Sequence, residues 1–110
     1  MHPRRGEVWW VSFDTSVGGE IQKTRPAIIM SNNAANSMLN RVIVVPLTSQ
    51  TTKVYPGEAL VTLNGEQRKA MADQIMIAAK QRLRAKLGGL SMSDVTAVQN
   101  AGLLQLGIRR

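Results

Sequence analysis

The sequence predicts a small domain of the mainly-β or α+β class, with several strands first and one helix last. Segments rich in β-branched and aromatic residues occur through the earlier part of the chain, and a helix-capping pattern occurs only near its end. The 110 residues, of which 44% are hydrophobic, suit one packed core. No repeat, linker or low-complexity tract divides the chain, so we expect residues 1–110 to form a single domain.

Four segments have the composition of β-strands. The third of them is the richest in β-branched residues, and Pro46 near its end predicts an edge strand or a bulge, because proline has no N–H for the ladder. Loops or turns are expected between the segments, and "NNAANSML" (32–39) is expected to be a polar bend with room for one helical turn. The four segments are "GEVWWVSFD" (6–14), "PAIIMS" (26–31), "NRVIVVPLTS" (40–49) and "EALVTL" (58–63).

The pattern of residues 64–90 predicts secondary structure less clearly than that of the first four segments, whereas the last segment predicts a helix. "NGEQRK" (64–69) is expected to be a turn, "AMADQIMIAA" (70–79) a strand running into a helical turn, and "KQRLRAKLGGL" (80–90) allows no single assignment. Ser91 predicts a helix start, because its side chain can cap the first turn and Asp94 follows at the capping-box spacing. This helix is expected to lie on the sheet through one face, formed by Val95, Val98, Gly102 and Leu106.

The charge of the chain favours a polyanionic partner. Lys and Arg total 14 against seven Asp and Glu, which gives a formal charge of +7. Nucleic acid is the first candidate and an acidic protein the second, and a basic surface without a partner stays open as the alternative. No apolar run reaches the roughly 20 residues of a membrane span, and the N-terminal stretch lacks a signal-peptide core, so we expect a cytoplasmic protein without a membrane partner.

Several kinds of chemistry lack the residues they need. The chain has no cysteine and one histidine, His2, which excludes a histidine acid/base pair and argues against a Ser-His-Asp triad and a structural zinc site. A magnesium site made of carboxylates alone is possible but unsupported, and no Walker-type phosphate loop is present. We therefore expect neither a metal nor a cofactor.

Two groups of polar residues flank the second and third expected strands. If these strands are neighbours, the two groups meet at one end of the sheet. Arg25 would then offer a planar fork that matches phosphate oxygens, with hydroxyl donors from Thr48 and Ser49. The residues alone favour a plainer arrangement, in which Arg25 pairs with Glu20 and the turn hydroxyls bind the backbone. The groups are Glu20, Gln22, Lys23 and Arg25 in one loop, and Thr48, Ser49 and Gln50 in the other.

Four stretches, taken in order, resemble the MazF/PemK/Kid family of toxin endoribonucleases. They are "RRGEVWWVSFD", "GGEIQKTRPAIIMSN", "VIVVPLTSQ" and "MADQI". The resemblance implies a small, strongly twisted antiparallel barrel with short helices and a C-terminal helix, a fold shared with the CcdB toxin, and it implies a homodimer. It also implies metal-independent, sequence-specific cleavage of single-stranded mRNA, which inhibits translation. An acidic MazE-like antitoxin is expected to restrain the toxin, and the toxin is expected to contact DNA only through that antitoxin.

The same resemblance implies roles for individual residues. The catalytic arginine falls on Arg25 and the catalytic threonine on Thr48. The acidic loop residue falls on Glu20, although the family's Gly-Ser-Glu-Gln pattern reads "GGEI" here and leaves Gln22 as the replacement for its glutamine. An aspartate–glutamine pair falls on Asp73 and Gln74. Met71 stands where some relatives carry an arginine, which weakens a mechanism that needs a second acid/base group there.

Cleavage of this kind uses the ribose 2′-hydroxyl as the nucleophile, so the protein supplies orientation, charge stabilisation and proton transfer. We expect Arg25 to stabilise the phosphorane and donate a proton to the 5′-oxygen, and Glu20 to act as the base. Tyr55, Trp9 and Trp10 are the available stacking groups, and one of the adjacent tryptophans should face the core. Phosphate contacts are expected from Lys23, Lys53, Arg68, Lys69, Arg82, Arg84 and Lys86. The expected RNA-binding set is Ser49, Gln50, Gln22, Lys23, Lys53, Tyr55, Asp73, Gln74 and Arg82.

Two other functions remain open at this point. A gyrase poison like CcdB would share the fold without needing Arg25 and Thr48. A basic barrel without catalysis would bind an acidic protein and leave RNA intact. The RNA sequence that is cut and the identity of the antitoxin do not follow from these residues.

Overall fold

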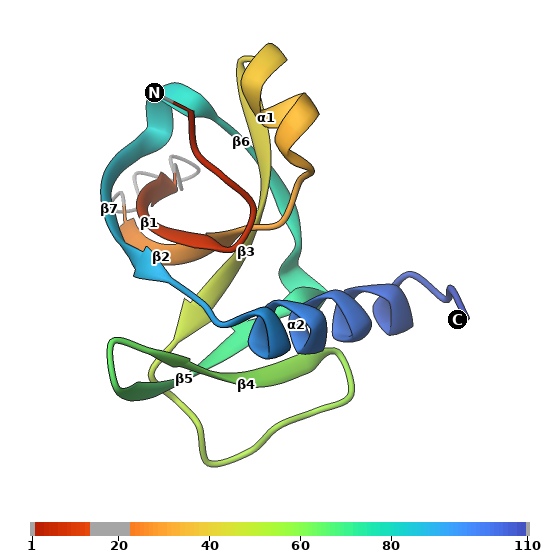
Figure 1. The fold of residues 1–110 in the computed structure, drawn as a ribbon. Helices are drawn as coiled ribbons and strands as arrows, with labels where there is room; N and C mark the ends of the chain where they lie inside the picture. Colours follow the sequence, from red (N-terminus) through yellow and green to blue (C-terminus); the bar gives the residue numbers. More distant parts are fainter. Residues whose placement is uncertain (1, 14–22, 110) are drawn as a thin grey trace, which may run out of the picture.

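Seven antiparallel strands form one strongly twisted sheet in a computed structural model that describes residues 2–13 and 23–109 (Figure 1). The order along the sheet is β4-β5-β3-β2-β1-β7, and β6 pairs with β3 outside this path. The strands are β1 (Glu7–Phe13), β2 (Lys23–Ile29), β3 (Arg41–Thr48), β4 (Glu58–Leu63), β5 (Glu66–Met71), β6 (Met76–Ala79) and β7 (Leu83–Gly89). The helices are α1 (Asn33–Met38) and α2 (Met92–Gln105), with short 3-10 helices η2 (Ala72–Gln74) and η3 (Lys80–Arg82).

The sheet is twisted, as expected, but it is not a closed barrel. Within the described ranges, β4 and β7 end the strand order and do not pair with each other. Figure 1 shows β1, β2 and β7 curling together at one end, while β4 and β5 extend away below α2. The expectation of a barrel is therefore corrected to a strongly twisted open sheet, because strand twist alone does not bring the outer strands into hydrogen-bonding register.

β3 is the central strand, and Pro46 marks the place where it changes partner. On one side β3 pairs with β2. On its other side it pairs with β6 along Arg41–Val44 and with β5 at Leu47 and Thr48. Pro46 lies between these two ladders, at a position where the missing N–H takes away the fewest ladder hydrogen bonds. The expected edge strand is thus wrong, and an interrupted ladder explains the proline.

Two apolar clusters hold the sheet. The first fills the space between the sheet and α2, and the second lies on the other face of β1, β2 and β3. β2 contributes side chains to both clusters, because successive residues of a strand face opposite sides: Ile28 packs in the first cluster, and Ala27 and Ile29 pack in the second. The buried members of the first are Val8, Ile28, Val45, Leu47, Ala59, Val61, Leu63, Ala70, Ala72, Val98 and Ala101, and those of the second are Val11, Ala27, Ile29, Val42, Val44 and Ala78.

The C-terminal helix begins as predicted. The Ser91 side chain accepts a hydrogen bond of 3.1 Å from the N–H of Asp94. The Asp94 carboxylate reaches across to β4, where it accepts a 2.9 Å hydrogen bond from the N–H of Thr62. The cap therefore also ties the helix to the outermost strand. Val98 and Gly102 are buried as expected, but Leu106 lies beyond the last helical residue and is exposed, so its assignment to the packed face was wrong.

The segment between β4 and α2 differs from the prediction. The turn is only Asn64–Gly65, where both residues have positive φ, as a two-residue hairpin of the Asn-Gly type requires. β5 starts at once with Glu66, so the expected longer turn is wrong. Residues 70–79 contain the end of β5, a 3-10 helix and β6 in place of a strand running into a helical turn. The ambiguous stretch 80–90 forms η3 and β7.

The short helix α1 fulfils the expectation of a helical turn after the second strand, with Asn32 as its cap. In the described part of the chain, neither helix has the length and apolar character to cross a bilayer.

Candidate functional site

Arg25 lies within β2, not in a loop before it. The predicted strand began at Pro26, but β2 begins at Lys23 because β1 supplies backbone partners as far as Phe13. Arg25 is paired with Val11 of β1, and its side chain is exposed. The expectation that Lys23 and Arg25 belong to a loop is therefore wrong, and a strand holds the backbone of Arg25 in place.

The register between β2 and β3 brings Arg25 of the first predicted group to Thr48 of the second. Ala27 pairs with Pro46 in this antiparallel ladder, so two further residues along each strand put Arg25 opposite Thr48, on the same face. Both residues line one open cleft with a volume of about 600 Å³. The assumption behind the prediction, that these two strands are neighbours in the sheet, is thus confirmed. The cleft is lined by Trp10, Arg25, Pro26, Leu47, Thr48, Ser49, Gln50 and Arg68.

Thr48 is the last residue of β3, and its hydroxyl oxygen accepts a 3.2 Å hydrogen bond from the N–H of Gln50. This bond holds the turn that follows the strand. A hydroxyl that accepts one hydrogen bond can still donate its own proton. Thr48 can therefore donate to an oxygen in the cleft beside the Arg25 guanidinium, while Ser49 and Gln50 are exposed at the rim.

A model of the family described as "PemK-like, MazF-like toxin of type II toxin-antitoxin system" matches residues 4–106. The chain belongs to this family. It is 38% identical over 114 residues to endoribonuclease MazF9 of Mycobacterium tuberculosis, covering 96% of this chain and 97% of that protein. It is 34% identical over 100 residues to the endoribonuclease toxin MazF of Escherichia coli K12, covering 88% and 87% of the two chains.

Solved structures of the family have the same fold. An endoribonuclease in complex with its cognate antitoxin, from a Mycobacterial species, matches with a TM-score of 0.80 at 27% identity over 98% of both chains. A MazE–MazF structure from Deinococcus radiodurans matches with a TM-score of 0.80 at 25% identity, over 99% of this chain and 100% of the other. The first of these structures contains the cognate antitoxin of that endoribonuclease.

In this member of the toxin family, four cleft residues were in neither the predicted catalytic set nor the predicted RNA-binding set, and Trp10 and Arg68 are the two whose side chains suit contact with RNA. Trp10 is 37% exposed, whereas Trp9 packs against the second cluster and donates a 3.1 Å hydrogen bond from its indole nitrogen to Glu7. The expectation that one of the adjacent tryptophans faces the core is thus confirmed. Arg68, on β5, is half-buried beside the cleft. The sequence named both as possible contacts, but it held no signal that β1 and β5 reach the same cleft.

Other predicted site residues lie elsewhere or outside the described residues. Glu20 and Gln22 fall in the segment that the structure does not describe. The Asp73 N–H donates a 3.0 Å hydrogen bond to the Gly57 carbonyl, which precedes β4. Arg82 donates a 3.2 Å hydrogen bond to the Ser12 carbonyl. Those that are described but do not line the cleft are Lys23, Lys53, Tyr55, Asp73, Gln74 and Arg82.

Lys69 is a correction to the expected phosphate contacts. It is only 8% exposed, and its ammonium pairs with Glu58 at 3.2 Å and donates to the Lys53 carbonyl at 3.0 Å. The N–H of Tyr55, together with Lys69, holds the pKa of Glu58 below its usual range against the opposing effect of burial. Lys69 therefore secures the loop before β4 and cannot reach RNA.

Lys86 also has a partner in the toxin. Its ammonium lies 3.0 Å from the Glu7 carboxylate. Burial raises the pKa of Glu7, but hydrogen bonds from the Arg4 N–H, Lys86 and Trp9 outweigh it and hold that pKa below its usual range. This network joins β1 to β7 away from the cleft. In the described ranges, no three His, Cys, Asp or Glu side chains gather in a way that could hold a metal ion.

Proposed function

We propose that this chain is the toxin of a toxin–antitoxin pair and acts as a cytoplasmic endoribonuclease that cuts single-stranded mRNA at specific sequences and so stops translation. The observation that carries the proposal is the cleft in which Arg25 and Thr48 lie opposite each other. Relatives that cover nearly the whole chain are named endoribonucleases, which favours RNA cleavage over gyrase poisoning and over a binding protein without activity. Residues 1–110 act as one toxin domain.

The cleavage step needs no group beyond the substrate and these side chains. The ribose 2′-oxygen forms a bond to the adjacent phosphorus while the bond from phosphorus to the 5′-oxygen breaks. The 2′-hydroxyl proton passes to a base, for which Glu20 is the candidate, and the departing 5′-oxygen takes a proton from Arg25. The products are a 2′,3′-cyclic phosphate and a free 5′-hydroxyl. Arg25 and Thr48 donate hydrogen bonds to the phosphate oxygens as their negative charge grows.

The acidic antitoxin is the second partner. A charge of +7 attracts an acidic chain as it attracts RNA, and relatives have been solved with their antitoxins. An acidic segment laid over Arg25 would exclude RNA, so antitoxin and substrate compete for one surface. Contact with DNA comes only through the antitoxin.

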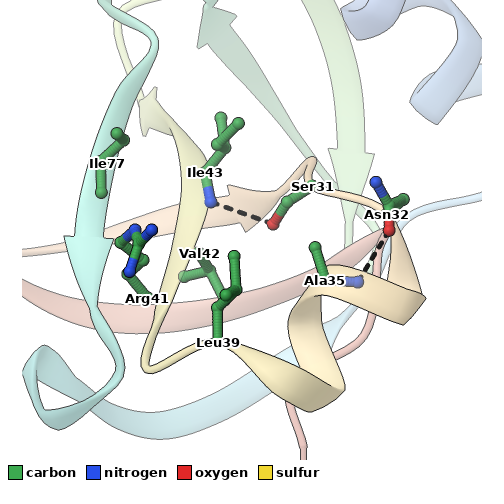
Figure 2. Close-up of a pocket in the computed structure, with 8 residues that line it drawn as sticks. All are labelled: Ser31, Asn32, Ala35, Leu39, Arg41, Val42, Ile43 and Ile77. Atoms are coloured by element: carbon green, nitrogen blue, oxygen red, sulfur yellow. Dashed lines mark hydrogen bonds between the residues drawn. The ribbon is translucent and has the colours of Figure 1, made fainter.

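We place the homodimer contact on an apolar surface that shares no residue with the cleft lining. Figure 2 shows Leu39, Ile43 and Ile77 gathered around a cavity between α1, β3 and β6, with a volume of about 180 Å³. Leu39 and Ile43 are each about 40% exposed and Ile77 is 62% exposed, which is unusual for neighbouring large apolar side chains on a monomer. Sedimentation of the wild-type chain and of Ile77→Lys tests this placement: the wild type should be a dimer and the variant a monomer.

The activity itself is tested with one long RNA and a single-stranded DNA of the same sequence, each incubated with the protein in EDTA. The RNA should be cut at a small set of sites whose 5′ fragments end in a cyclic phosphate, and the DNA should stay intact because it lacks the nucleophile. Addition of an acidic antitoxin should stop the reaction. Intact RNA in the absence of antitoxin would contradict the proposal.

A further inference from the structure

We propose that Trp10 and Arg68 lengthen the cleft into a track for RNA, in which a base next to the cut stacks on Trp10 and a phosphate on the other side of the cut binds Arg68. The inference rests on the proposed function, since it concerns how the same site holds its substrate. It assigns a stacking position and a phosphate position that the family match and the named relatives do not supply.

The strand order places the Arg25–Thr48 pair between the two strands that carry Trp10 and Arg68. Trp10 comes from β1, Arg25 from β2, Thr48 from β3 and Arg68 from β5, and these strands are consecutive in the sheet. With neighbouring strands about 4.8 Å apart, β1 and β5 are separated by about 14 Å. Trp10 pairs with Pro26 and Arg25 with Val11, so strand alternation turns the indole and the Arg25 side chain toward different faces, and the cleft that both line reaches round the strand ends. Trp10 and Arg68 come from the outer two of these four strands and the Arg25–Thr48 pair from the inner two, so RNA held in the cleft would place the scissile phosphate between the two new positions.

Trp10 suits stacking better than the other aromatic residues of the chain. Among the described residues it is the one aromatic side chain that lines the cleft. Its register partner Pro26 lines the cleft too, so the indole lies against a rigid neighbour. Trp9 is engaged with Glu7, Phe13 packs against the second cluster, and Tyr55 lies on the loop before β4. An exposed indole face accepts any unpaired base.

Arg68 suits a phosphate because its present contacts are weak. One of its guanidinium nitrogens lies 3.5 Å from the carboxylate of Glu66, whose side chain is 71% exposed, and another donates to the Gln67 carbonyl at 3.1 Å. A solvent-exposed ion pair of this kind adds little stability, so a phosphate can replace the carboxylate. A guanidinium has five N–H donors, so Arg68 can bind a phosphate and still donate to the Gln67 carbonyl.

The experiment uses a short single-stranded RNA with one cut site and the variants Trp10→Leu, Trp10→Phe and Arg68→Gln. Arg4→Gln is the matched control, because it removes an equal charge from an exposed arginine outside the cleft. Trp10→Leu should raise KM about tenfold with little change in kcat, and Trp10→Phe should restore most of the loss. Arg68→Gln should lower the slope of log affinity against log salt by about one, and Arg4→Gln should not.

Base removal separates stacking from a structural effect. Bases are deleted one at a time from the RNA, and at one position next to the cut the loss in wild-type protein should match that caused by Trp10→Leu. In Trp10→Leu, deletion of the same base should cause no further loss. A neutral methylphosphonate at one phosphate across the cut should likewise abolish the difference between wild type and Arg68→Gln.

The outcomes distinguish this inference from the proposed function. If wild-type protein cuts the RNA but Trp10→Leu keeps its KM, or its loss is the same whichever base is deleted, the stacking position is wrong. If wild-type protein does not cut, the proposed function fails first. Should Trp10→Leu fold poorly, tryptophan emission decides the question: uncuttable RNA with a 2′-deoxy residue at the cut should quench the wild type and leave Trp10→Phe unquenched.

Discussion

Replacement of Arg25 with alanine is expected to lower kcat for RNA cleavage by about 10²–10³-fold, with the fold intact. The side chain is exposed on a paired strand and contributes to no apolar cluster, so its loss removes donors to the phosphate and little packing. Single-turnover cleavage of a defined RNA in EDTA measures the effect, and thermal unfolding of the same sample checks the fold.

Two further variants sharpen this prediction. Arg25→Lys keeps the charge but not the planar fork, so it should recover only a small part of the rate. Arg4→Ala removes one positive charge from outside the cleft and should cleave almost as fast as wild type. Unchanged cleavage by Arg25→Ala, or an equal loss in Arg4→Ala, would show that general charge and not this guanidinium carries the rate.

Replacement of Lys69 with methionine is expected to lower the free energy of unfolding by about 3 kcal/mol, because it leaves Glu58 enclosed without its cation. The side chains of this pair are only 11% and 10% exposed. Methionine retains the unbranched stem, so packing changes little and the loss reports on the charge. Urea unfolding of the variant and of the wild type measures the difference.

The double variant Lys69→Met with Glu58→Gln is the control, since a neutral partner no longer needs the cation and much of the stability should return. The pair also sets the response to acid. Because its folded-state pKa is lowered, Glu58 contributes stability above the ordinary glutamate pKa of about 4.3, and this is lost as pH falls. Glu58→Gln should therefore lose less stability than wild type between pH 7 and acid; a parallel decline in both would contradict this.

The parts of the fold that the sequence predicted are those in which local pattern decides the structure. Composition placed the first four strands, and Ser91 and Asp94 placed the start of α2. The meeting of Arg25 and Thr48 needed only one further assumption, that two successive strands pair antiparallel, which is the commonest arrangement of neighbouring strands in a chain. The central feature of the cleft could be anticipated for this reason.

The rest depended on which strands become partners, and a local pattern does not carry that information. β5 holds Glu66, Gln67 and Arg68 and resembled a turn, yet it pairs with β4 along its whole length. Lys69 resembled a surface cation until the loop before β4 enclosed it beside Glu58. Trp10 and Arg68 reach one cleft only because β1, β2, β3 and β5 are consecutive in the sheet. Barrel closure failed as an expectation for the same reason.

The most direct measurement replaces one ribose in a cleaved RNA, the nucleotide on the 5′ side of the cut, with 2′-deoxyribose, and follows cleavage at that site and at a second, unmodified site in the same molecule. If Arg25 and Thr48 stabilise a phosphate that is attacked by the neighbouring 2′-oxygen, the modified site stays whole while the second is cut at its normal rate and ends in a cyclic phosphate. Cleavage of the modified site at an unchanged rate would mean that another nucleophile does the work, and the assignment of this cleft would fall with it.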